Sequence, residues 1–71
     1  MQKHIKMSAI TEFVKTRRKQ LKLTQEEFAQ KAGVALTVIR KIEQGKDNLS
    51  LSSVNQVLKM FGHVLEPVSE K

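Results

Sequence analysis

The side chains best suited to specific chemistry lie in residues 36–44, where Ile39 and Ile42 recur at helical spacing. On the opposite face of such a helix lie Leu36, Thr37, Arg40 and Lys41. Positions 36, 37 and 40 share one side of a helix with about 3.6 residues per turn, so they can enter a DNA groove together. A guanidinium can donate to guanine O6 and N7 at once, and a threonine can bond a base or pack on a thymine methyl. These residues are therefore candidate readers of DNA bases.

The members of this face differ in what they can read. Arg40 is the expected bidentate guanine contact, worth about 1–3 kcal/mol of discrimination between bases. Ala35, just before the helix, can pack on a thymine methyl, and Leu36 can read only shape and methyl groups. An exposed or interface leucine is an equal alternative for Leu36. Lys41 shares the base-reading face, although a lysine ammonium there favours a phosphate.

A second short helix, earlier in the chain, is needed to position the 36–44 helix. Thr24 followed by Glu27 is a capping box, which predicts a helix over about 25–31. Gly33 stands where this helix must stop and where the chain can need a left-handed conformation. Gly45 ends the following helix. Two short helices across a tight turn predict a helix-turn-helix, which offers one helix face to the DNA major groove.

Four residues at the ends of these helices are candidate phosphate contacts. Thr24 and Gln25 lie at the start of the 25–31 helix, where free amides and the helix dipole favour an anion. For Thr24, capping alone is the alternative, and both roles can coexist. Gln44 and Lys46 flank the end of the 36–44 helix. Such contacts orient a protein on DNA without reading its sequence.

Two further helices complete an all-α bundle. Ser8 can cap a first helix that runs to about Gln20, and Ser50 can cap a fourth over about 51–61, which Gly62 ends. Their apolar stripes are expected to face the core, and they comprise Ile10, Phe13, Val14 and Leu21 in the first helix and Leu51, Val54, Val57, Leu58 and Phe61 in the fourth.

The tail has a different pattern. Residues 63–68 are short, partly β-branched and interrupted by a proline, which predicts an edge strand. A lone strand is not stable, so we expect it to pair across a two-fold dimer through Val64, Leu65 and Val68. A disordered tail is the alternative. The expected organisation is a flexible arm over 1–7, a DNA-binding domain over 8–62 and a dimerisation strand and tail over 63–71.

Composition narrows the class of protein. The 71 residues carry a net charge of +6, and the charge is unevenly distributed. Residues 1–46 hold eleven Lys/Arg against four Glu (+7), while residues 47–71 hold two Lys against three acids (−1). The basic part coincides with the expected helix-turn-helix, which favours a polyanionic partner on one side and a protein contact on the other. A merely basic small protein is the alternative.

Several functions are not expected. Cysteine is absent and only two histidines occur, so we expect no disulfide, no metal site and no cofactor. We find no phosphate-binding glycine loop and no nucleophile–base pair, so we expect no enzyme. No apolar stretch approaches the length of a transmembrane helix and no signal peptide is visible, so we expect a cytoplasmic protein. A short chain without disulfides or a metal site gains stability most easily from a second subunit, which favours a dimer.

Residues 10–61 resemble the lambda-repressor/Cro-like helix-turn-helix family, and the resemblance rests on Arg18 and residues 23–27, 32–34 and 39–46. It implies a four- or five-helix bundle with the third helix in the major groove and an ion pair between Arg18 and Glu43. An acid in the last turn of a helix opposes the dipole, so Glu43 needs a cationic partner; a solvated carboxylate is the alternative. The sequence departs from the family pattern at Lys22, where glycine is usual, and at Ala35, where a hydroxyl cap is usual.

Within that family, Gln44, Gly45 and Lys46 followed by a helix and a strand resemble the HipB-like antitoxins. This resemblance implies a dimeric autorepressor that binds a palindromic operator and pairs with a HipA-like serine/threonine kinase toxin. A stand-alone or phage-type regulator without a toxin is one alternative, and a protein-interaction module without DNA binding is another.

Overall fold

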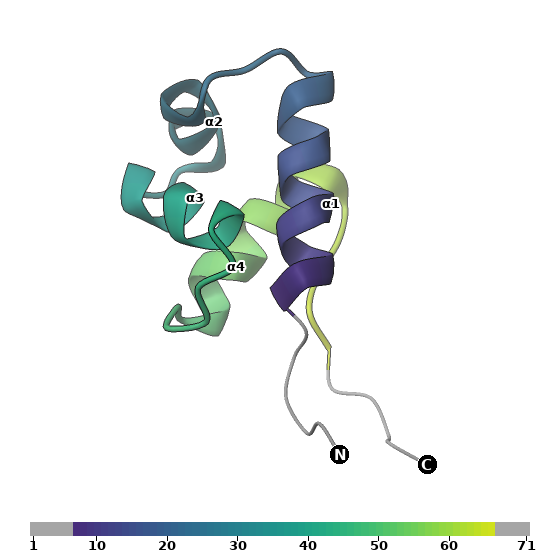
Figure 1. Ribbon diagram of the computed structural model, residues 1–71, viewed down its shortest axis with the longest axis vertical. Coiled ribbons are helices and arrows are strands. Elements are labelled where there is room, and N and C mark those ends of the chain that lie inside the picture. Colours follow the sequence, from purple (N-terminus) through teal and green to yellow (C-terminus); the bar gives the residue numbers. More distant parts are fainter. Residues whose placement is uncertain (1–6, 67–71) are drawn as a thin grey trace.

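The computed structural model describes residues 7–66, which form a helical bundle without a strand (Figure 1). Four α-helices, α1 (Met7–Gln20), α2 (Gln25–Ala32), α3 (Leu36–Glu43) and α4 (Leu51–Leu58), are followed by the 3-10 turn η1 (Lys59–Phe61). The fold class is therefore all-α, as expected. Within this part of the chain, no helix is long and apolar enough to cross a membrane.

One core holds the four helices together. Each helix contributes at least one fully buried side chain, and these are Val14, Phe28, Ile39, Ile42 and Val57. Burying such a side chain contributes about 1.5–3 kcal/mol. Helices α2, α3 and α4 have only eight residues each, which is too short to be stable alone in water. Packing on this core is what makes them helical.

The start of α2 and the turn between α2 and α3 have the predicted local structure. The Thr24 hydroxyl accepts the Glu27 amide at 3.1 Å, and Glu27 Oε1 accepts the Thr24 amide at 2.8 Å. Gly33 has φ +75° and its amide donates to the Ala29 carbonyl at 2.9 Å. Ala35 makes no side-chain cap for α3. The capping box, the left-handed glycine and the uncapped α3 are confirmed.

The structure differs from the prediction in four places at or beside the helix ends. Helix α1 begins at Met7, so Ser8 lies inside it and is not its cap, and residues 1–6 lie outside the described part of the chain. Leu21 is 51% exposed because α1 has ended before it. Leu51 is 56% exposed because it is the first residue of α4, at the edge of the bundle. The α-helical part of α4 also ends earlier than predicted, and Gly62 stops the following 3-10 turn in a left-handed conformation with φ +71°.

The predicted C-terminal strand is not formed. Residues 63–66 are irregular, and Val68 lies outside the described residues. The Leu65 amide donates to Asn55 Oδ1 at 2.7 Å, so α4 takes a backbone donor that a strand ladder would need. Leu65 packs on the core, whereas Val64 is 57% exposed. The sequence pattern missed this contact because Asn55 lies ten residues earlier.

Lys22, which stands where the resembled family usually has glycine, adopts a left-handed conformation. Its φ is +58°, the only positive φ at a non-glycine residue between residues 7 and 66. A Cβ in this conformation costs about 1–2 kcal/mol. The strained residue therefore lies in the link that connects the end of α1, which carries Arg18, with the start of α2.

Replacing Lys22 with glycine is expected to raise the free energy of unfolding by about 1 kcal/mol, because the steric penalty disappears. Urea denaturation of Lys22→Gly measures the change. Lys19→Gly, which removes the same charge from inside α1, is the control, and it is expected to lower stability by about 0.5–1 kcal/mol. Equal destabilisation by both variants would contradict the strained-link interpretation.

Candidate nucleic-acid interface

Helix α3 turns one face to the core and the other to solvent. Ile39 and Ile42 are fully buried. On the other face Thr37 and Arg40 are exposed, and Leu36 and Lys41 are half-buried. Ala35, which precedes the helix, is exposed. The structure therefore brings the candidate base-reading residues to one accessible face.

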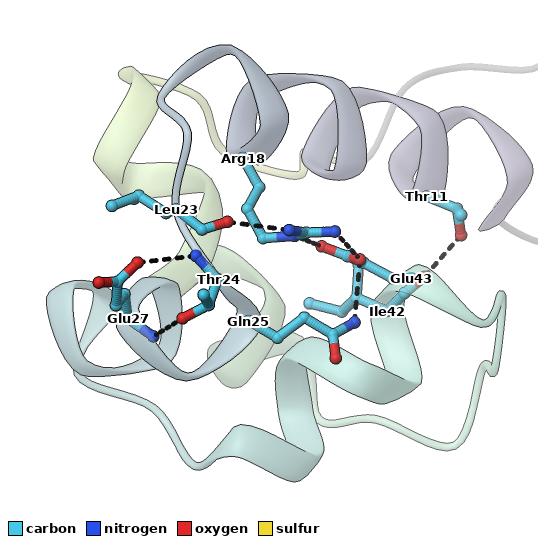
Figure 2. A network of polar contacts seen from close by, with 8 residues as sticks. All are labelled: Thr11, Arg18, Leu23, Thr24, Gln25, Glu27, Ile42 and Glu43. Atoms are coloured by element: carbon cyan, nitrogen blue, oxygen red, sulfur yellow. Dashed lines mark hydrogen bonds and ion pairs between the residues drawn. The ribbon is translucent and has the colours of Figure 1, made fainter.

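The far end of this helix is tied to α1 by a bidentate ion pair. Arg18 Nε lies 2.7 Å from Glu43 Oε2, and Arg18 Nη2 donates to Glu43 Oε1 at 3.0 Å. Arg18 Nη1 also donates to the Leu23 carbonyl at 2.9 Å. Figure 2 shows the guanidinium lying between the α1–α2 link and the end of α3. The pair that the family resemblance implies is thus present, and one arginine joins three segments of the chain.

The Glu43 carboxylate is almost fully shielded from solvent. Burial works to raise its pKa, but hydrogen bonds from Arg18 and Gln25 and the positive charges of Arg18 and Lys15 outweigh burial, so the pKa of Glu43 lies below its usual value. The hydrogen bond to Glu43 raises the pKa of Arg18. Both groups are therefore charged at neutral pH.

Gln25 makes a contact that the sequence did not predict. Its amide Nε2 donates to Glu43 Oε1 at 3.0 Å, and the side chain is half-buried (Figure 2). One amide proton thus serves the ion pair, which leaves the second proton and the carbonyl for other contacts. Sequence reasoning assigned only a phosphate role because nothing in the local pattern connects Gln25 with a residue 18 positions later.

The other candidate phosphate contacts are accessible. Thr24 is exposed, and although its oxygen accepts the Glu27 amide, its own proton remains a donor. Gln44 and Lys46 are exposed just beyond the end of α3. These residues lie at the start of α2 and beyond the end of α3, so they bracket the helix-turn-helix along the chain.

Two positioning contacts were missed by the sequence analysis. Thr11, buried in α1, donates to the Ile42 carbonyl of α3 at 2.6 Å. Gln56 of α4 donates through Nε2 to the Ala32 carbonyl at the end of α2, 3.2 Å away. The one available signal for Thr11 is its place beside Ile10 in a stripe that is otherwise apolar. Among residues 7–66, no cluster of three or more metal-ligating side chains occurs.

A comparison with known protein families agrees with this arrangement of helices. A model of the helix-turn-helix family covers residues 14–64, from the middle of α1 to the segment after η1. None of the curated proteins matches the chain.

Replacing Glu43 with glutamine is expected to lower the free energy of unfolding at neutral pH by about 3 kcal/mol, because Arg18 then loses its charged partner in a shielded site. Because folding lowers the pKa of Glu43, its carboxylate stabilises the fold above the unfolded value of about 4.3, and this contribution is lost as the pH falls through the folded pKa. The difference between the parent and Glu43→Gln should therefore shrink below about pH 4.

Denaturation curves at a series of pH values measure this difference. Glu12→Gln, on the exposed side of α1, is the matched control and is expected to change stability by less than about 0.5 kcal/mol. A Glu43→Gln deficit that stays constant down to the lowest pH would contradict the ion-pair account.

Proposed function

Because the chain belongs to the lambda-repressor/Cro-like helix-turn-helix family, we propose that it is a repressor that binds its own operator as a two-fold dimer. Family membership makes it a DNA-binding regulator. The observation that carries the repressor proposal is the outward face of α3, where Thr37 and Arg40 are exposed while Ile39 and Ile42 on the opposite face are buried. Because its buried face is packed on the core, the helix can present its exposed side chains to the major groove with little loss of conformational freedom.

In this proposal each residue of the face has its own task. Arg40 donates to guanine O6 and N7, and Thr37 bonds a base edge or contacts a thymine methyl. Ala35 and Leu36 contribute methyl and shape contacts at the start of α3. Lys41, which is half-buried, extends its ammonium to a base edge or to the adjacent phosphate.

Phosphate contacts on both sides would hold α3 in the groove. Thr24 and Gln25 offer side-chain donors at the N-terminus of α2, where the helix dipole favours an anion. Gln44 and Lys46 offer donors beyond the end of α3. Because Gln25 also bonds Glu43, a phosphate contact there would be coupled directly to the ion pair that positions α3.

One subunit touches too few bases for useful specificity, which supports a dimer. A two-fold dimer reads a palindromic operator whose half-sites are spaced by about 10 base pairs or a multiple. The C-terminal segment supports this arrangement through the exposed Val64 beside Leu65.

The finer proposal is an antitoxin role. The similarity of Gln44, Gly45 and Lys46 with the following helix to HipB-like antitoxins supports a complex with a HipA-like kinase toxin. A gene for such a kinase next to this one, and a stable complex between the two purified proteins, test this proposal. If neither is found, a stand-alone or phage-type regulator remains, and failure to prefer any upstream site would leave a protein-interaction module.

Binding to the DNA just upstream of the gene should weaken steeply with salt. Lys41 and Lys46 give four lysine–phosphate contacts per dimer, so the slope of log K against log salt is expected near −3.6, about −0.9 for each contact. Scrambled DNA of equal length is the control. It should show a comparable slope but at least tenfold weaker binding at every salt concentration, because base contacts are lost.

Replacing Arg40 with alanine is expected to reduce the preference for the upstream site by about 1–3 kcal/mol, or tenfold for each 1.4 kcal/mol or so, while the fold is retained. Fluorescence anisotropy with both DNAs measures the preference. Lys59→Ala removes the same charge from the exposed surface of η1, and it should weaken both complexes equally. An Arg40→Ala protein that still discriminates as well as the parent would refute the assignment of Arg40 as base reader.

A further inference from the structure

The turn that follows α3 carries two of the candidate phosphate contacts, Gln44 and Lys46, and both residues are exposed. The Gly45 amide donates to the Ile42 carbonyl at 3.1 Å, and Gly45 is left-handed, with φ +77°. The Lys46 amide donates to the Lys41 carbonyl at 2.9 Å. These two bonds form a Schellman motif, which satisfies carbonyls in the last turn of a helix. The direction in which Gln44 and Lys46 leave α3 therefore depends on this turn.

One buried hydroxyl attaches this turn to α1. Thr11 is 8% exposed, and its hydroxyl donates to the Ile42 carbonyl at 2.6 Å. Figure 2 shows this bond reaching from α1 to the end of α3. A Cβ placed on Gly45 would lie 3.8 Å from Thr11 Oγ1, an ordinary packing distance, so the turn also lies against this hydroxyl. We propose that Thr11 is a positioning residue, which holds the turn where Gln44 and Lys46 can reach the DNA backbone.

The ion pair between α1 and α3 fixes the end of α3 less directly. Arg18 holds Glu43 by its carboxylate, at the end of a side chain with several rotatable bonds, so the backbone can shift while the ion pair persists. Thr11 instead holds the backbone itself, at the Ile42 carbonyl. Thr11 and Arg18 are seven residues apart on α1, which is about 10 Å along the helix axis. Two attachments at this separation fix both the position and the direction of the end of α3.

The hydroxyl can be removed without removing the shape of the side chain. Valine has nearly the outline of threonine but offers no donor. In Thr11→Val the Ile42 carbonyl would still accept the Gly45 amide, so the end of α3 stays paired and the fold should be retained. What is lost is the bond that ties the turn to α1.

This inference rests on the proposed DNA binding and adds to it a residue that does not touch DNA. The Thr11 hydroxyl is buried and already bonded to Ile42, so it acts through Lys46. A lysine–phosphate contact strengthens binding to any sequence and contributes about −0.9 to the slope of log K against log salt. With Lys46 displaced, only Lys41 remains, and the slope for a dimer should change from about −3.6 to about −1.8.

The test is Thr11→Val in the full-length chain, with binding to the upstream DNA and to scrambled DNA followed by fluorescence anisotropy over a range of salt concentrations. Both complexes should weaken, and both slopes should fall to about half of the parent value. Thr11→Ser keeps the hydroxyl and is expected to keep the parent slope. Thr16→Val, the same substitution at an exposed threonine of α1, is the matched control and should also leave the slope unchanged.

A second pair of variants tests whether the effect passes through Lys46. Lys46→Ala should give the same reduced slope, about −1.8. Adding Thr11→Val to Lys46→Ala should change the slope no further, because the contact that Thr11 positions is already absent. A merely structural role is distinguished by the same readout, since a smaller fraction of folded protein lowers the apparent affinity but leaves the slope unchanged.

The outcomes separate this inference from the proposed function. A Thr11→Val protein with the parent slope, or a Thr11→Ser protein with a halved slope, overturns the positioning role even if the parent prefers the upstream DNA. A parent that binds both DNAs equally refutes the repressor function, while a slope that still halves in Thr11→Val supports the positioning role. A parent that binds neither DNA overturns both. Circular dichroism must first show that the variants are helical; an unfolded Thr11→Val is replaced by Thr11→Ala, with the same expected direction.

Discussion

The ion pair between Arg18 and Glu43 is the interaction on which the arrangement of this molecule depends. Glu43 ends α3 with a carboxylate where the helix dipole is unfavourable to negative charge, and the carboxylate is almost fully shielded from water. Such a group is tolerated only with a charged partner and further hydrogen bonds, which Arg18 and Gln25 supply. Because Arg18 also holds the Leu23 carbonyl, one guanidinium sets the positions of α1, the link to α2 and the end of α3.

Two further contacts of the helix-turn-helix follow the same pattern, since each joins it to another helix of the bundle. Thr11 of α1 bonds the Ile42 carbonyl, and Gln56 of α4 bonds the Ala32 carbonyl at the turn before α3. Ala35 adds no side-chain cap. An eight-residue helix without a cap has little stability of its own. Its orientation is therefore a property of the bundle, and this makes its solvent face a rigid surface.

The positive charge of the chain is unevenly distributed along the sequence. It is concentrated in residues 1–46, which include α1, α2 and α3, and the remainder is close to neutral. The part of the chain that attracts a polyanion is therefore the part that contains the helix-turn-helix. Helix α4 contributes Val54, Val57 and Leu58 to the core that supports it.

Local structure could be predicted from the sequence wherever a few neighbouring residues decide it. The capping box at Thr24, the left-handed Gly33 and Lys22, and the buried stripe of α3 all depend on residues within a turn or two of each other. Contacts between distant residues could not be predicted from periodicity. Gln25 donates a hydrogen bond to Glu43, and Asn55 accepts one from the Leu65 amide where a strand was predicted. The Arg18–Glu43 contact came from family resemblance, because the pattern alone shows only that Glu43 needs a cation. The sequence by itself thus determined where α2, α3 and α4 begin, which face of α3 is apolar and that the charge is asymmetric. Only the tertiary structure decided which polar groups are shielded together and which leucines remain exposed, because those depend on how far the bundle reaches over each helix end.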